Sequence, residues 1–215
     1  FTDGNPTAIT ADMRIKSTSP CVQKPLIRGV IASNEGETPS ALFSHVGNGL
    51  APNSAGCAYT GGAHILTDFR FIPDKDIWGN SLATSYKTNP QIVPDDGVPY
   101  DGPGGGTSGV DRLSPTDGDT VVKAATNAAD EAGRRIRSGG VDPVHGRSLP
   151  GVVIYSIGLG SVTPELLMRI SNINDASNTS YDSNLREGMY LHAPEPEQLE
   201  DAFNRIASEI LRLAQ

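Results

Sequence analysis

The segment 151–157, with the sequence GVVIYSI, constrains the fold more than any other part of the chain. It is a continuous apolar run of strand length, without the alternation that marks a strand with one face in water. Strands of this kind are buried on both faces and belong to parallel sheets covered by helices on each side. The neighbouring segments are therefore expected to be helical.

A helical pattern precedes this run at residues 119–137. It starts at a candidate N-cap, Asp119 or Thr120, and it ends in arginines followed by Ser138 and two glycines. That combination is typical of a helix with a stop signal. The expected apolar face consists of Val122, Ala125, Ala129, Ala132 and Ile136.

Two more helices follow the run, separated by a short strand at 189–192. The first has Thr163 as its expected N-cap and Pro164 at its first position. The last covers 194–215. Its expected apolar stripe is Leu199, Phe203, Ile206, Ile210 and Leu213. With a strand expected to end at Phe1, the alternation predicts an α/β fold with a doubly wound, mostly parallel sheet of the Rossmann type.

Residues 5–118 have a different texture, rich in proline, glycine and serine. Short β-like runs such as 26–31 and 64–72 lie between turn signals, and helical periodicity does not extend beyond about two turns. Aromatic and β-branched residues recur throughout. We therefore expect a long insertion with a few strands of its own, rather than a disordered loop.

The two cysteines, Cys21 and Cys57, both fall in this insertion. A disulfide between them would close a loop worth about 4 kcal/mol in the chain-entropy model. Such a bond suits a poorly cored segment of an exported protein. The alternative is two unpaired thiols in a cytosolic protein.

Charge and hydropathy narrow the choice of partners. The formal net charge is −8, and no block of lysine or arginine occurs, which argues against nucleic acid or an anionic membrane surface as the main partner. No apolar run approaches the roughly 20 residues that cross a bilayer, and no signal peptide is evident.

Several motifs in fixed order carry a family resemblance. They are the Thr2-Asp3-Gly4 turn, GVVIYSIGLG at 151–160, PELLMRISN at 164–172 and EQLEDAFNRIASEILRL at 197–213. This set resembles the second half of a von Willebrand factor A (VWA) domain, of the kind carried by bacterial Tad-type pilus-assembly and related surface proteins. The resemblance covers 1–4 and 119–215, a little under half of the chain, with 5–118 as an insertion.

The resemblance implies that the sheet is incomplete at the N-terminus. In the family the turn at Asp3 ends the fourth strand, so the first three strands would lie outside this sequence. Either the chain is a fragment or another polypeptide supplies those strands; we favour the fragment.

The resemblance also implies a metal-ion-dependent adhesion site that holds Mg²⁺. Such a site combines a D-x-S-x-S motif after the first strand, a threonine from a later loop, and the aspartate of the T-D-G turn. Of these ligands only Asp3 has a counterpart here, and it is expected to act through a water, with the remaining ligands outside this chain. A carboxylate after a buried strand suits a hard cation, although from position alone Asp3 could equally cap its own turn.

Other motifs favour plain structural roles. Residues 175–179 imitate D-x-S-x-T, but no buried strand precedes them, so we expect a decoy. Residues 74–80 resemble a calcium loop, but Trp78 replaces an oxygen ligand and no glutamate follows at the twelfth position, which favours a turn. Ser156 lies within the expected strand and lacks the first glycine of a nucleophile elbow. Asn178 begins a glycosylation sequon that a bacterial chain would usually leave unused.

The predicted function is that of a non-enzymatic binding module. The insertion leaves the sheet beside Asp3, and its aromatic residues are candidate contacts for a protein partner: Tyr59, Trp78, Tyr86 and Tyr100. We expect an adhesion protein of a bacterial surface or pilus, in an extracellular or periplasmic location. The alternative is a structural subunit of a larger surface or membrane assembly with an incomplete or unused metal site. A hydrolytic enzyme would need a catalytic constellation that the sequence does not display.

Overall fold

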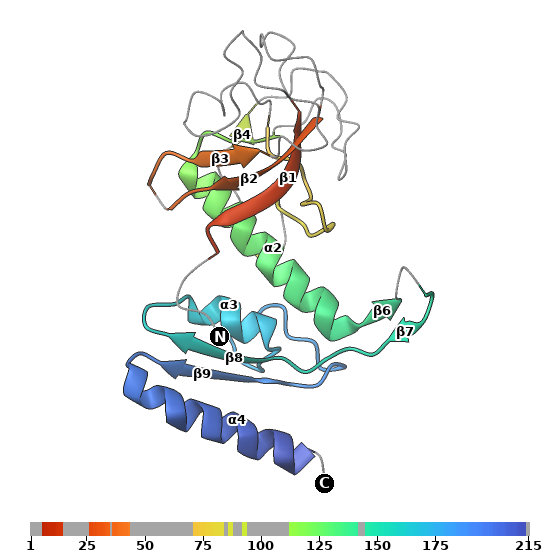
Figure 1. Ribbon diagram of the computed structural model, residues 1–215. Coiled ribbons are helices and arrows are strands. Elements are labelled where there is room, and N and C mark those ends of the chain that lie inside the picture. The colour runs from red at the N-terminus through yellow and green to blue at the C-terminus, as the bar shows by residue number, and fades with distance from the viewer. Residues whose placement is uncertain are drawn as a thin grey trace. The chain divides into compact units, whose positions relative to one another are not determined.

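The computed structural model divides into two compact units, both containing helix and strand (Figure 1). The insertion unit is Pro6–Ala129, and the C-terminal unit is Asp130–Gln215 together with Phe1–Asn5. The mixed α/β class is thus confirmed. The described residues are 6–14, 26–34, 36–43, 71–83, 86–87, 92–93, 112–141 and 145–213.

The insertion unit contains an antiparallel sheet of order β1-β2-β3. Its strands are β1 (Ala8–Arg14), β2 (Leu26–Ala32) and β3 (Ser40–Phe43), and Ile9 lies opposite Ile31 in the register. A separate two-stranded pair joins β4 (Ile92–Val93) to β5 (Arg112–Leu113). Strands therefore occur within residues 5–118.

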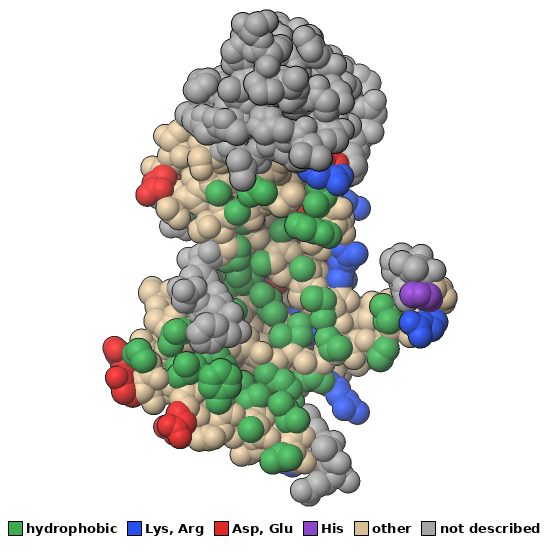
Figure 2. Space-filling view, viewed as in Figure 1, with side chains coloured by type: hydrophobic (Ala, Val, Ile, Leu, Met, Phe, Trp, Pro, Cys, Tyr) green, Lys and Arg blue, Asp and Glu red, His purple; other side chains and the backbone are tan. Residues whose placement is uncertain are grey.

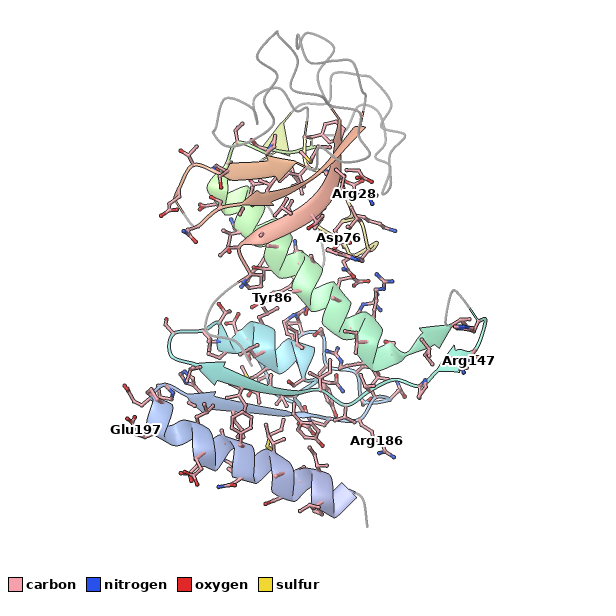
Figure 3. The ribbon with its side chains drawn as sticks, in the orientation of Figure 1. Arg28, Asp76, Tyr86, Arg147, Arg186 and Glu197 are labelled. Atoms are coloured by element: carbon pink, nitrogen blue, oxygen red, sulfur yellow. The ribbon has the colours of Figure 1, made fainter. Side chains whose placement is uncertain are left out.

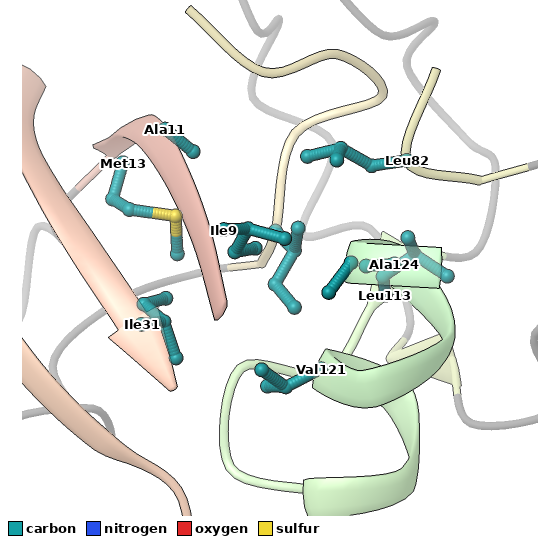
Figure 4. Close-up of a cluster of buried hydrophobic side chains, with 10 residues drawn as sticks. Ile9, Ala11, Met13, Ile31, Leu82, Leu113, Val121 and Ala124 are labelled. Carbon is teal, nitrogen blue, oxygen red and sulfur yellow. The ribbon is translucent and has the colours of Figure 1, made fainter. Parts of the chain in front are cut away.

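The core of this unit lies between the sheet and the first half of helix α2, Gly118–Ser138 (Figure 4). Alternate residues of β1 point inward, as expected for a strand with one buried face. The buried set is Ile9, Ala11, Met13, Ile31, Ile72, Leu82, Leu113, Val121, Ala124 and Ala125. The insertion therefore depends on α2 for its core.

Helix α2 covers nearly the residues predicted for it, but its N-cap residue and the extent of its apolar face differ from the prediction. The backbone N–H of Thr120 donates to Oδ2 of Asp117 at 2.8 Å, so Asp117 takes the capping role expected of Asp119 or Thr120. Asp119 accepts instead from the N–H of Gly36 at 3.0 Å. The apolar face does not continue to Ile136, which is 52% exposed.

The C-terminal unit is built on a parallel pair, β8 (Tyr155–Leu159) and β9 (Met189–Ala193). Helix α3 (Pro164–Ile170) lies against one face, where the Ser156 hydroxyl donates to the carbonyl of Leu167. On the other face, Ile157, Leu191 and Ala193 pack with α4 (Leu199–Leu213), which follows the 3₁₀ turn η1 (Pro196–Gln198). The parallel pairing expected for the apolar run is confirmed.

The apolar run enters its strand later than predicted. Residues 151–154 lie outside β8, because they lie along the end of α2. The N–H of Val152 donates to the carbonyl of Ile136 at 3.3 Å, and a Cβ added at Gly151 would stand 1.8 Å from the carbonyl oxygen of Arg137. A short exposed hairpin of β6 (Gly140–Val141) and β7 (Ser148–Leu149) precedes this segment.

Helix α4 buries only one flank of its predicted stripe. Ala202 is buried, and Leu199 and Ile206 are partly buried against the sheet, but Phe203 is 52% and Ile210 is 50% exposed. Hydrophobic side chains accordingly gather over α4 in the space-filling view (Figure 2). The predicted stripe is wider than the surface that β8 and β9 cover.

A buried ion pair connects the end of α2 to α3. Nε and Nη2 of Arg169 donate to the two carboxylate oxygens of Asp130, each at 2.9 Å, and both side chains are almost fully buried. Arg137 donates from Nη1 to the carbonyls of Arg169 and Ile170, which closes the C-terminal end of α3. Burial is the main cause that lowers the pKa of Arg137.

A buried asparagine organises the loop between α3 and β9. Asn172 has a positive φ of 56° and is fully buried. Its side-chain amide donates to the carbonyl of Asp182 at 3.0 Å, and its side-chain oxygen accepts from the N–H of the same residue at 2.9 Å. The loop is therefore fixed from within by polar contacts. Among the described residues, no helix is long and apolar enough to cross a membrane.

Replacing Ile31 by alanine is expected to destabilise the insertion unit by about 2–5 kcal/mol, because a fully buried side chain is truncated. The single tryptophan, Trp78, belongs to this unit, so its fluorescence during denaturation reports the loss. Val30→Ala, in the same strand but only half-buried, should cost less than half as much. Equal losses would contradict the position of the core.

Replacing Arg169 by alanine is expected to destabilise the C-terminal unit by about 3–5 kcal/mol, because the buried Asp130 carboxylate loses the cation that compensates it. Hydrogen exchange of the β8 and β9 amides measures this loss. A double variant, Asp130→Leu with Arg169→Met, should be less destabilised than Arg169→Ala alone. If it is destabilised more, the ion pair is not the source of the effect.

Candidate functional site

A tight turn at 75–81 presents Trp78 to solvent. Lys75 and Ser81 form an antiparallel bridge at the base of the turn. Gly79 has a φ of 84°, a conformation in which glycine avoids the steric cost of a side chain. The indole of Trp78 is 63% exposed, the largest aromatic exposure in the part of the chain that the structure describes.

The carboxylate of Asp76 holds this turn together (Figure 3). Its Oδ1 accepts from the backbone N–H groups of Trp78 at 2.9 Å and Asn80 at 2.8 Å, and its Oδ2 accepts from the Asn80 side chain at 2.8 Å. Asp76 is only 4% exposed. The calcium-like sequence therefore folds as a turn around its own aspartate, which agrees with the favoured interpretation.

The turn is also anchored to the sheet and the core of the insertion unit. The N–H of Ile77 donates to the carbonyl of Thr10 in β1 at 3.1 Å. Leu82, just after the turn, donates to the carbonyl of Asp74 at 2.9 Å and is fully buried. Trp78 is therefore presented on a backbone that is hydrogen-bonded on both sides.

Tyr86, another predicted contact residue, is half-buried in a segment fixed by α2. Asn127 of α2 accepts from the backbone N–H of Tyr86 at 2.9 Å and donates to the carbonyl of Leu82 at 3.1 Å. The ammonium of Lys87 lies 4.1 Å from the centre of the Tyr86 ring. The sequence analysis did not single out Asn127; a polar residue within an alanine-rich helix was the available signal.

The remaining predicted site residues lie outside the described residues. They are Asp3, Cys21, Cys57, Tyr59 and Tyr100. The magnesium site and the disulfide stay predictions.

The carboxyl edge of β8 and β9 is the other place where this fold offers a site. There the N–H of Gly160 donates to the carbonyl of Ala193 at 3.1 Å, and Nε2 of His192 donates to the carbonyl of Gly160 at 2.8 Å. The ring of Tyr190 stacks on the ring of His192. Burial raises the pKa of the Tyr190 hydroxyl. Within the described ranges, no cluster of three His, Cys, Asp or Glu side chains could hold a metal.

The D-x-S-x-T imitation is a structural loop. Oδ1 of Asp175 accepts from both the N–H and the hydroxyl of Ser177, at 2.8 and 2.6 Å, and these bonds lower the pKa of Asp175. Asn178, the sequon asparagine, is buried, and its amide donates to the carbonyls of Met168 and Ile173. Thr179 accepts from Nη1 of Arg169 at 2.9 Å. These side chains are engaged in folding the loop.

Ser156, the serine weighed as a nucleophile, is likewise engaged in packing. Its hydroxyl is buried, lies 2.6 Å from the hydroxyl of Ser171, and donates to the carbonyl of Leu167 at 3.3 Å. It therefore ties β8 to α3 and its C-terminal end.

Replacing Asp76 by alanine is expected to loosen the Trp78 turn, because the two buried donors of Asn80 and the part-buried N–H of Trp78 lose their acceptor. The insertion unit should lose about 1–3 kcal/mol of stability, and acrylamide should quench Trp78 fluorescence more efficiently. The matched control is Asp175→Ala, which removes a similar aspartate turn from an exposed loop of the other unit. That control should leave both readings unchanged.

No protein-family model, no curated protein and no solved structure matches this chain.

Proposed function

We propose that this chain is a non-enzymatic protein-binding module of the adhesion type. The observation that carries the proposal is the exposed indole of Trp78 on a turn fixed by Asp76. An aromatic side chain on a rigid backbone gains contact area at little entropic cost, which is characteristic of binding hot spots. Bound partners would contact this turn first.

We further propose that 1–4 and 119–215 belong to one doubly wound sheet of the VWA kind, with 5–118 as its insertion. Two observations support this. The pair β8 and β9 is parallel, with α3 and α4 on opposite faces, and β8 has no second strand partner among the described residues. The exposed flank of α4, with Phe203 and Ile210, would find a surface on a wider sheet.

In this proposal Asp3 contributes to a Mg²⁺ site at the carboxyl edge of the sheet, through a water. The cation would be shared between the domain and an acidic group of the partner. The chain would act at a bacterial surface or pilus, in an extracellular or periplasmic location.

The second candidate function is that of a structural subunit in a larger surface or membrane assembly. The observation that favours it is the apolar flank of α4, because two half-exposed side chains one heptad apart, Phe203 and Ile210, suit burial against another element. In that case the metal site is incomplete or unused.

Purified chain added to bacteria that display this protein is expected to inhibit their adherence, because it occupies the partner that the displayed protein would bind. Trp78→Ala should require at least about tenfold more protein for the same inhibition, since the loss of a hot-spot side chain costs about 2 kcal/mol or more. Counts of adherent bacteria at a series of protein concentrations measure the inhibition by the unchanged chain and by the variant.

Val141→Ala, a truncation at another exposed apolar residue, should inhibit as well as the unchanged chain. EDTA should weaken inhibition by the unchanged chain but not by Asp3→Ala, if Asp3 contributes to the cation site. A chain that leaves adherence unaffected and sediments with the surface assembly would support the structural subunit instead.

A further inference from the structure

We propose that the peptide bond between Arg147 and Ser148 is a site of limited proteolysis, and that its hydrolysis converts the chain into two pieces that stay bound to each other. The enzyme class that fits this bond is an endoprotease specific for arginine. This modification goes beyond the proposed binding function and does not depend on it.

The bond lies in the exposed hairpin of β6 and β7. Only two residue pairs hold this hairpin together, Gly140 with Leu149 and Val141 with Ser148. All of its described residues are exposed, and Val141 is 68% exposed. A Cβ added at Gly140 or Gly146 would meet no atom within 4 Å. A hairpin this short, with open space around its glycines, opens at little cost, and exposed segments of this kind are preferred sites of proteolytic nicking.

Arg147 is placed where a protease can recognise it. It is exposed and stands between β6 and β7, with Gly146 before it and Ser148 after it (Figure 3). An endoprotease specific for arginine takes this side chain into an acidic pocket and pairs with extended backbone beside it. The strand β7 already supplies extended backbone after the bond. A surface contact holds an exposed arginine only weakly, so the pocket can capture the side chain from such a contact.

The other arginines in the described ranges are harder to cut. All of them lie in helices or strands except Arg186, in the loop before β9. Arg186 is exposed, but its carbonyl, on the bond that would break, accepts from the side-chain amide of the buried Asn172 at 3.4 Å. After that bond, the Glu187 carboxylate accepts from the N–H of Asn174 at 2.9 Å. Arg147 therefore offers the bond that is reached with the least unfolding.

The reaction is an ordinary peptide hydrolysis. A water molecule is consumed, and the C–N bond between the two residues breaks. Arg147 gains a carboxylate and Ser148 gains an ammonium group, while the protease is regenerated and nothing is oxidised or reduced. The products are the pieces 1–147 and 148–215.

Contacts outside the hairpin hold these two pieces together. Asp130 in the first piece pairs with Arg169 in the second, at 2.9 Å for each bond, and both side chains are buried. Arg137 in the first piece donates to the carbonyl of Ile170 in the second at 2.7 Å. None of these groups belongs to the hairpin, so the cut leaves their contacts in place.

The test treats the intact chain under native conditions with a small amount of clostripain, an endoprotease specific for arginine, and follows the pieces by intact mass. We expect the first cut to yield 1–147 and a second piece that begins Ser148-Leu149-Pro150. The two pieces should co-elute in gel filtration and separate only in denaturant. A first cut at any other arginine would overturn the proposal, as would a nicked chain that separates without denaturant.

Two variants identify the bond. Arg147→Lys keeps the charge and should slow the first cut by clostripain at least about tenfold, since cutting elsewhere needs a larger opening of the structure. Trypsin, which also accepts lysine, should still cut this variant after residue 147. The matched control, Arg186→Lys, changes the other exposed loop arginine of the same unit and should leave the first cut by clostripain unchanged. If Arg147→Lys is cut as fast as the unchanged chain, or if Arg186→Lys protects the chain, the proposal fails.

Discussion

The buried pair between Asp130 and Arg169 is the contact on which the C-terminal unit depends. It joins the last part of α2 to α3, while Arg137 closes the end of α3 and Thr179 accepts a bond from the same guanidinium. Charges placed this deeply are costly unless every polar atom finds a partner. The pair and its neighbours therefore link helix, helix and loop through directional polar contacts.

Elsewhere the chain relies on single buried polar side chains to shape its irregular segments. Asp76 organises the Trp78 turn, Asn127 fixes the segment at 86–87, and Asn172 and Asn178 hold the loop before β9. Each of these side chains forms hydrogen bonds with backbone groups of irregular segments. This is how a segment rich in turns becomes ordered without a large core, because buried backbone groups must find partners.

Periodicity and end signals predicted the regular elements of the C-terminal half well. Helix α2, helix α3 and the parallel pairing of β8 all follow from patterns within a few neighbouring residues. The candidate site was less predictable. The sequence of 74–80 favoured a turn over a calcium loop, because Trp78 replaces an oxygen ligand, but only the structure shows that the buried Asp76 carboxylate organises that turn. Phe203 and Ile210 fit the stripe of α4 but are half exposed, since β8 and β9 are too narrow to cover it.

The sequence by itself determined the alternation of helix and strand after residue 118, the extent of α2, the start of α3 and the parallel character of the apolar run. These are local properties, set by side-chain periodicity and by capping residues. Tertiary structure alone decided that the first half of α2 serves the core of the insertion unit, that Asp130 meets Arg169, and that Trp78 faces solvent. Each of these results joins residues far apart in the chain or depends on which flank of an element is covered, and no local pattern encodes that.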